Sequence, residues 1–213
     1  MIRLAVFFGN PGPGYARNRH NAGRMTAQAL PFYQFLSWQK KFNGLYASYN
    51  GSHFLMPETY MNRSGISVQA AASFFKIELK DIIIIHDELE LPLGTISLKY
   101  AGGLGGHNGL RSMKDSFGSA DCWRLRIGIG RLDSRLPGKG GSAADSADSE
   151  ANQKIVDWVL TDFSNEEKET LIPALEAGAN LLIKTFTEDP ETLLNEWKKK
   201  KISPHEKINK TEE

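Results

Sequence analysis

Four short stretches of this sequence carry the side chains best suited to acid–base chemistry, and each lies beside an apolar run, a glycine-rich turn or a predicted helix start. They are Asn10 with His20 and Asn21, Asn62, His86 with Asp87, and His107 with Asn108. His20 has an ordinary pKa near neutrality, so we interpret it as a general base. Asp87 is the carboxylate that can fix its tautomer and stabilise the imidazolium. The asparagines add neutral donors and acceptors that can hold a substrate carbonyl or an oxyanion without a metal.

These residue types also allow a plainer interpretation. A loop histidine is often hydrogen-bonded to the backbone, and an asparagine in a glycine-rich loop is often only a turn former. A site is favoured because several stretches deliver such residues to the ends of predicted strands, where open α/β sheets gather their ligands.

The composition is that of an ordinary globular chain. Its 213 residues are 40% hydrophobic and 24% charged, enough for one sizeable domain with a core. A net charge of +1 gives no overall attraction to nucleic acid or an anionic membrane, so a polyanion site must be a local patch. Cys122 is the single cysteine and cannot form an intramolecular disulfide. No segment approaches the roughly 18 apolar residues of a membrane span, and we expect a cytoplasmic protein.

The hydrophobic pattern predicts an α/β fold: a single globular domain with a twisted, mixed parallel and antiparallel β-sheet flanked by helices. The apolar run at 2–8 and the four isoleucines at 82–85 are typical of strands buried on both faces. Asn50-Gly51 lies between two apolar runs and predicts a hairpin, so part of the sheet is antiparallel. The remaining strands are expected at 42–49, 52–56, 94–100 and 124–129.

Helices and loops divide the rest of the chain. Ser164 and Glu167 match a capping box, and Pro173 should bend or break the helix that they begin. Residues 133–153 are rich in Gly, Ser, Ala and Asp and are expected to form a mobile surface loop. The packed domain should then span residues 1–197, with a disordered basic tail at 198–213. Helices are predicted at 21–29, after residue 65, at 110–117, from 165 to about 186, and from 190 to 197.

Five motifs resemble those of the bacterial peptidyl-tRNA hydrolase family and occur in the family's order. They are GNPGPGYARNRHNAG at 9–23, PETYMNRSG at 57–65, HDELELPLG at 86–94, GGLGGHNGLRS at 102–112 and RLRIGIG at 124–130. Five matched blocks are a specific signal, whereas one would not be. The resemblance covers residues 1 to about 130 closely and is looser from residue 154 onwards.

The resemblance implies a hydrolase that cleaves the ester between a peptide, or an N-blocked amino acid, and the 3′ ribose of tRNA, releasing tRNA for reuse in translation. His20 is similar to the family's catalytic base and Asp87 to the carboxylate that orients it. An ester needs only a positioned water, a base and a polarising donor, so neither a metal nor a cofactor is expected.

The resemblance also assigns residues that bind the substrate. Asparagines would grip the peptide and position the water, two tyrosines would lie beside the peptide and the terminal nucleotide, and a basic pair would bind the 5′ phosphate of tRNA. The expected partner is peptidyl-tRNA, through its acceptor stem, 3′ end and 5′ phosphate, with no membrane partner and a monomeric protein. These residues are Asn10, Asn21, Asn62 and Asn108; Tyr15 and Tyr60; and Lys99 and Arg126.

The sequence departs from the family pattern at a few positions. Asn18 stands where the family usually has threonine, and Leu132 replaces a common proline. The 133–153 segment is longer than usual, which affects what this edge contributes to tRNA binding. The lysines at 198–201 could add salt-sensitive RNA affinity, although a solvated helix end is the simpler interpretation.

Three other functions remain open at this point. A metal-dependent hydrolase could use His20, His86, Asp87 and His107, but the helical His-x-x-x-His spacing of common zinc sites is absent from the sequence. A dinucleotide-binding module could use the loop at 102–109, which lacks the full GxGxxG pattern. A non-catalytic protein with the same residues would bind tRNA and leave the ester intact.

Overall fold

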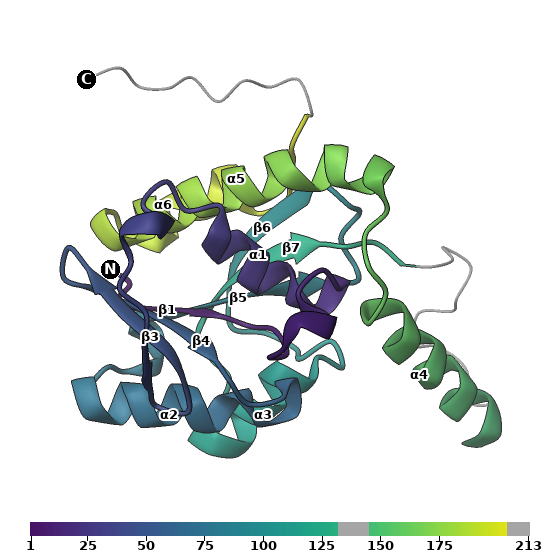
Figure 1. Cartoon of the computed structure of the whole chain (residues 1–213), viewed down its shortest axis with the longest axis horizontal. Coiled ribbons are helices and arrows are strands. Elements are labelled where there is room, and N and C mark those ends of the chain that lie inside the picture. Colours follow the sequence, from purple (N-terminus) through teal and green to yellow (C-terminus); the bar gives the residue numbers. More distant parts are fainter. Residues whose placement is uncertain (132–144, 204–213) are drawn as a thin grey trace.

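A computed structural model describes residues 1–131 and 145–203, with side chains left undescribed at 145–151. Its centre is an eight-stranded sheet in the order β2-β3-β4-β1-β5-β7-β6-β8, drawn in Figure 1 with helices on both sides. The prediction of a mixed α/β sheet is confirmed. The strands are β1 (Leu4–Phe7), β2 (Gln39–Lys41), β3 (Gly44–Tyr49), β4 (Ser52–Pro57), β5 (Ile82–Glu88), β6 (Thr95–Tyr100), β7 (Trp123–Gly128) and β8 (Lys200–Lys201).

The centre of the sheet is parallel and its edges are antiparallel. β1 lies parallel to β4 and β5, and β5 lies parallel to β7. The carboxyl ends of these strands therefore meet at one end of the sheet, where side chains from distant parts of the sequence can converge. Antiparallel pairing joins β2 to β3, β3 to β4, β6 to β7 and β6 to β8.

The four isoleucines of β5 explain why the sheet needs helices on both faces. Successive side chains of a strand point to opposite faces, so a continuous apolar run must be buried twice. Ile83 and Ile85 pack in one core with residues of α1, α5 and α6, while Ile82 and Ile84 pack in a second core with residues of α2 and α3. Figure 1 shows these two helical layers above and below the sheet. The helices are α1 (Ala22–Gln28), α2 (Ser64–Phe75), α3 (Asn108–Phe117), α4 (Asp145–Val159), α5 (Asn165–Thr187) and α6 (Pro190–Trp197).

The hairpin and the capping box form as predicted. Asn50 and Gly51 both have positive φ, 48° and 80°, which is the backbone conformation that a tight two-residue hairpin requires. The hydroxyl of Ser164 accepts from the backbone N–H of Glu167, and the Glu167 carboxylate accepts from the backbone N–H of Ser164. Pro173 lies inside α5 without breaking it. Leu171 and Ala174 pack in the core on either side of the proline, and this burial offsets one lost hydrogen bond.

The expected loop at 133–153 is wrong in its second part. The helix α4 begins at Asp145, so residues 145–153 are helical, while residues 133–144 lie outside the described part of the chain. The prediction relied on the lack of large apolar residues. Alanine, glutamate and glutamine favour helix without them, so a lack of large apolar residues does not exclude a helix.

The predicted end of the packed domain is also wrong. Lys200 and Lys201 form β8 and pair with β6, which adds a strand at the sheet edge. Ile202 follows, buried, and its backbone N–H donates to the carbonyl of Gly94 at 2.8 Å. The composition of the lysine-rich tail predicted disorder, because a single isoleucine has little effect on it; in the structure, burial of Ile202 holds this segment against the sheet. The packed structure therefore continues to Ile202, and residues 204–213 of the expected tail lie outside the described residues.

Candidate active site

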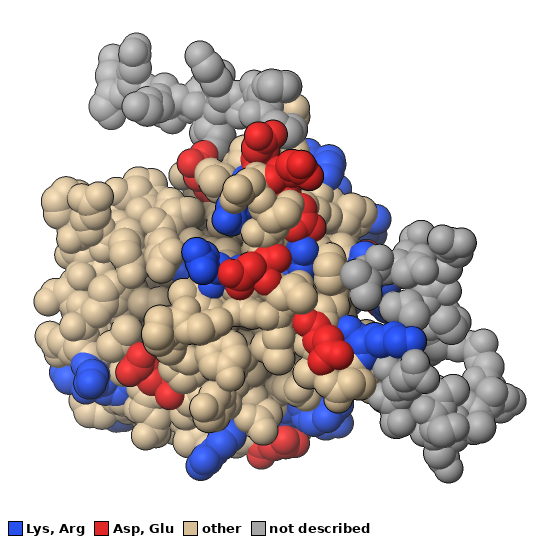
Figure 2. Space-filling model, turned by 45° about the vertical axis from the view of Figure 1, so that its right-hand side comes forward, with Lys and Arg blue, Asp and Glu red and all other residues tan. Residues whose placement is uncertain are grey.

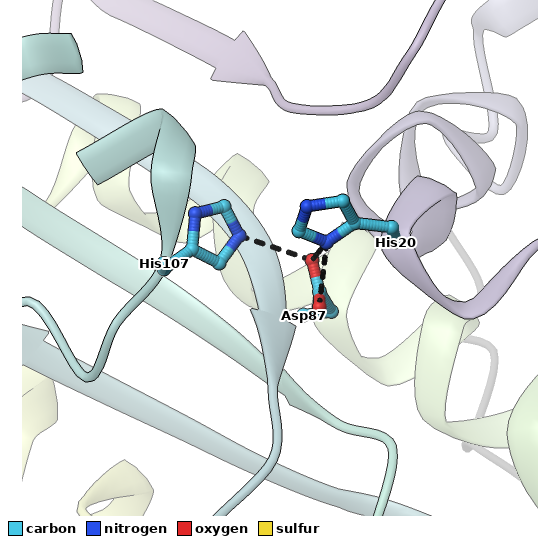
Figure 3. Close-up of side chains that lie close together, drawn as sticks. All are labelled: His20, Asp87 and His107. Atoms are coloured by element: carbon cyan, nitrogen blue, oxygen red, sulfur yellow. Dashed lines mark hydrogen bonds and ion pairs between the residues drawn. The ribbon is translucent and has the colours of Figure 1, made fainter. Parts of the chain in front are cut away.

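Three polar side chains from three different elements meet at the carboxyl end of the parallel strands (Figure 3). His20 lies in a short 3₁₀ turn, η2 (Arg19–Asn21), directly before α1. Asp87 lies near the end of the central strand β5. His107 is the N-cap residue of α3. All three are largely shielded from solvent, so their hydrogen bonds act at a lower effective dielectric than in water.

His20 and Asp87 form the pair that the sequence predicts. The Nδ1 atom of His20 lies 2.9 Å from Oδ1 and 3.0 Å from Oδ2 of Asp87. A carboxylate can only accept here, so the ring carries its proton on Nδ1 and leaves the Nε2 lone pair free. This is the tautomer that a general base needs.

His107 is a third member of the cluster; the sequence singled it out but gave it no role in the predicted hydrolase site. Its Nε2 atom lies 3.1 Å from Oδ1 of Asp87, and its Nδ1 atom accepts from the backbone N–H of Gly109 at 3.1 Å. Both ring nitrogens are therefore occupied, with the proton on Nε2. The sequence signal was a histidine in a glycine-rich loop just before a helix, which is also an ordinary capping position.

The charges of the cluster stabilise one another. Burial raises the pKa of Asp87, but the two histidines that donate to it outweigh this effect and hold its pKa far below the usual range. Burial lowers the pKa of His20, and the adjacent Asp87 charge and hydrogen bond raise it above its ordinary value of 6.5. The site therefore holds a carboxylate that stays ionised and a histidine whose imidazolium form is favoured by its partner.

Close backbone packing brings His20 to Asp87. Gly23, in the first turn of α1, lies against the ends of β1 and β5, and a Cβ atom there would lie 2.4 Å from the carbonyl oxygen of Ile85 and 2.5 Å from that of Phe8. Only glycine permits this approach. The start of α1, and the turn before it, are thereby held against the strand that carries Asp87.

The side chain of Asn21 makes two hydrogen bonds to the backbone of Asn10. The side-chain oxygen of Asn21 accepts from the backbone N–H of Asn10 at 2.8 Å, and its amide donates to the carbonyl of Asn10 at 3.0 Å. The side-chain oxygen of Asn10 accepts from the backbone N–H of Met61 at 2.8 Å. Asn21 therefore holds the loop after β1 in place, and Asn10 ties that loop to the segment that carries Asn62.

Four other predicted substrate residues are exposed or half-buried. Asn62 lies in the 3₁₀ turn η4 (Met61–Arg63), and Asn108 is the first residue of α3; both side chains are exposed. Tyr15 is half-buried and lies edge-on to the exposed ring of Tyr60, with the ring centroids 6.5 Å apart. Aromatic rings and amides at one surface are suited to a peptide or a nucleobase.

Lys99 and Arg126 lie on neighbouring antiparallel strands. Arg126 is opposite Ser97 in the β6–β7 register, so Lys99, two residues further along β6, shares its face of the sheet. The guanidinium of Arg126 donates to the hydroxyl of Ser97 at 2.7 Å and lies 3.3 Å from the carboxylate of Glu88. The two basic side chains thus share one face of the sheet, and Arg126 has an acidic neighbour.

The geometry disfavours the metal and dinucleotide alternatives. The His20, Asp87 and His107 ligand atoms lie within 4.8 Å of one another, but the Nδ1 atom of His107 accepts a backbone N–H, so its Nε2 carries a proton instead of a lone pair for a metal. The side chain of His86 points to the backbone carbonyl of Asp87, at 2.7 Å. The glycine-rich loop joins β6 to α3, and β6 pairs antiparallel with β7, unlike the parallel unit of dinucleotide-binding folds.

The fold and the site together define an α/β protein with a buried histidine–carboxylate cluster at the ends of parallel strands. Residues 4–205 match the peptidyl-tRNA hydrolase family model. The peptidyl-tRNA hydrolase of Treponema pallidum is 40% identical over 211 residues, covering 94% of this chain and 96% of the relative. That of Citrifermentans bemidjiense is 40% identical over 185 residues, covering 84% of this chain and 89% of the relative. The chain belongs to the peptidyl-tRNA hydrolase family.

Solved structures agree with this membership. A peptidyl-tRNA hydrolase crystallised with N-propanol superimposes with a TM-score of 0.77 at 31% identity, covering 92% of this chain and 94% of that chain. The Acinetobacter baumannii peptidyl-tRNA hydrolase gives a TM-score of 0.73 at 32% identity, covering 92% and 96%. The family recognised from the five sequence motifs is confirmed.

Proposed function

We propose that His20 is the general base with which this chain hydrolyses peptidyl-tRNA, and that Asp87 orients it. The observation that carries this proposal is the contact of His20 Nδ1 with both carboxylate oxygens of Asp87, at 2.9 and 3.0 Å. It leaves Nε2 free to take a proton from water as that water attacks the ester carbonyl. The imidazolium that forms is stabilised by the ionised carboxylate. A positioned base of this kind contributes about 10² to 10⁴ in rate.

Neutral amides complete the proposed mechanism. Asn62 and Asn108 have exposed side-chain amides; Asn108 follows His107 in the chain, and Asn10 ties the loop after β1 to Met61, the neighbour of Asn62. An amide N–H can stabilise the negative charge that develops on the carbonyl oxygen. The ester then breaks to give a free peptide and the 3′ hydroxyl of tRNA, with no step that requires a metal or a cofactor.

Recognition of tRNA is proposed to be local. On the face that Figure 2 shows, basic and acidic side chains are interspersed, in keeping with the net charge of +1. We therefore assign the 5′ phosphate to Lys99 and Arg126, and the 3′ end to Tyr15 and Tyr60. Within the described residues, each helix is too short or too polar to cross a bilayer. A cytoplasmic, monomeric protein that contacts the acceptor stem stays a prediction.

The test is cleavage of N-acetyl-aminoacyl-tRNA in the presence of EDTA, with free aminoacyl-tRNA as the unblocked control. Wild type should cleave the blocked ester, and His20→Ala should lose about 10² to 10⁴ in turnover while it keeps its tRNA affinity. Equal loss of turnover and affinity would assign His20 to binding or folding. Bound tRNA with an intact ester in wild type would favour a non-catalytic RNA-binding protein, and loss of activity with EDTA would restore the metal alternative.

A further inference from the structure

The residue before the proposed base makes a set of contacts that the reaction itself does not explain. The Arg19 side chain is only 4% exposed, although it carries a positive charge. Its guanidinium carbon lies 3.7 Å from the ring centroid of Trp158 and 4.7 Å from that of Phe163. Its Nε atom donates to the hydroxyl of Thr161 at 3.1 Å, and Nη2 donates to Glu167 at 2.8 Å. Burial of a charge is costly, so this arrangement needs a reason.

These partners belong to the junction between the consecutive helices α4 and α5, which is distant in sequence from Arg19. Trp158 lies near the end of α4, Thr161 and Phe163 lie in the link to α5, and Glu167 lies in the first turn of α5. The same Glu167 carboxylate oxygen also accepts from the backbone N–H of Ser164 in the capping box. Arg19 is therefore held by stacking, by a neutral hydrogen bond and by an ion pair, all from one short segment of the chain.

The backbone of the catalytic turn is bound to the same segment. The backbone N–H of Arg19 donates to the carbonyl of Thr161 at 3.0 Å, and the side-chain amide of Asn18 donates to the carbonyl of Leu160. Asn18 also forms an isolated antiparallel bridge with Asp162. Asn18, one of the departures from the family pattern, thus contributes to the attachment that holds the turn before His20.

We propose that Arg19 is a positioning residue, which fixes the place of the His20 ring by anchoring its turn to the α4–α5 junction. The inference rests on the proposed role of His20 as base. Asp87 holds the ring from the side of β5, and the turn that carries the ring is only three residues long. The attachment to the α4–α5 junction fixes the backbone of that turn. Arg19 is paired with Glu167, so it acts on His20 through geometry and adds little net charge to its surroundings.

A kinetic comparison distinguishes this role from a purely structural one. Arg19→Met removes the ion pair and the fork of donors, and Arg19→Lys keeps the charge while it loses the planar stack. We expect kcat to fall by about 10- to 100-fold in Arg19→Met, because a small misplacement of a reacting group has this effect. Arg19→Lys should lie between Arg19→Met and wild type. In both variants KM should stay within about twofold of wild type and the inflection of the pH–rate profile should not move.

Two controls keep the proposal open to refutation. Trp197→Leu in α6 alters a buried residue of the same core away from this junction, so at a matched loss of thermal stability it should retain kcat. If the Arg19 variants do not fold, Thr161→Val provides the test, because it removes the hydroxyl that accepts from Arg19 Nε and should also lower kcat. The proposal fails if folded Arg19→Met keeps wild-type kcat, or if Trp197→Leu loses as much. A failure of the base assignment is distinguishable, since His20→Ala would then remain active.

Discussion

Replacing Asp87 with asparagine separates the charge of the carboxylate from its size. In the wild type, burial lowers the pKa of His20 and the Asp87 charge and hydrogen bond more than reverse this effect. With the charge removed and the burial kept, the pKa of His20 should fall below its ordinary value of 6.5. Since the neutral ring is the active base, activity should rise with pH through an inflection above 6.5 in wild type and below 6.5 in Asp87→Asn.

The loss of rate follows from the hydrogen-bond geometry. Both carboxylate oxygens face His20 Nδ1, at 2.9 and 3.0 Å, so an asparagine places an N–H group opposite another N–H. The His20 ring must then turn, or its proton must move from Nδ1 to Nε2, where no lone pair is left to accept a proton from water. A hydrogen bond to a charged group contributes about 1.5–3 kcal/mol, which corresponds to about 10- to 100-fold in rate. We expect this loss at the high-pH plateau, smaller than that of His20→Ala.

The assay is hydrolysis of N-acetyl-aminoacyl-tRNA from about pH 5 to about pH 9, corrected for spontaneous ester cleavage. An inflection that stays in place, or moves upward, in Asp87→Asn would refute the electrostatic reasoning. An unchanged plateau would refute the orienting role. Direct titration of the His20 ring by NMR distinguishes a shift of its pKa from a change in the rate-limiting step.

The same pair predicts a pH dependence of stability. The raised pKa of His20 contributes stability that is fully present below pH 6.5 and is lost as pH rises through the folded value. The lowered pKa of Asp87 contributes stability that is present above pH 3.8 and is lost on acidification. The difference in unfolding free energy between wild type and Asp87→Asn should therefore be largest between pH 3.8 and pH 6.5. Denaturant unfolding at a series of pH values measures it.

Two further substitutions test the packing that supports the site. Gly23→Ala should destabilise the protein by about 1–3 kcal/mol or more, because the added Cβ atom would meet two backbone oxygens. Gly14→Ala is the control, because open space surrounds Gly14 and the protein should not be destabilised. Equal thermal stability of the two variants would contradict the close approach of Gly23 to the strands. Ile202→Ala should cost about 2 kcal/mol in unfolding free energy, with exposed Ser203→Ala as its control. An unaffected Ile202 variant would place the end of the packed domain at residue 197 after all.

The parts of the fold that local chemistry determines were predictable from the sequence. Four consecutive isoleucines require burial on both faces, and Asn50-Gly51 accepts positive φ, so the central strand and the hairpin followed from single short motifs. His20 and Asp87 could be paired because His20 comes after β1 and Asp87 lies near the end of β5, the parallel neighbour of β1. Residues 145–153 and Ile202 were misjudged because helix formation and edge pairing depend on neighbours that composition does not reveal.

The site residues that were missed depend on contacts between distant segments. The sequence singled out His107 beside Asn108 and as a possible metal ligand, but it could not show that this residue caps α3 with one ring nitrogen and contacts Asp87 with the other. The Arg19 side chain is buried by partners far away in the sequence: its contact with Thr161 spans 142 positions and its contact with Glu167 spans 148. Nothing in the sequence around Arg19 indicates a contact with a segment so far along the chain.

These sequence separations also set an order in which the site can be assembled during synthesis. The His20–Asp87 contact spans 67 positions and the His107–Asp87 contact spans 20, so both can form once α3 has left the ribosome. Glu167, the partner of Arg19, lies 60 positions beyond His107. Because synthesis runs from the N-terminus, the segments that carry His20, Asp87 and His107 are all made before the residues that bind Arg19. The histidine–carboxylate cluster can therefore form in the nascent chain before the α4–α5 junction exists.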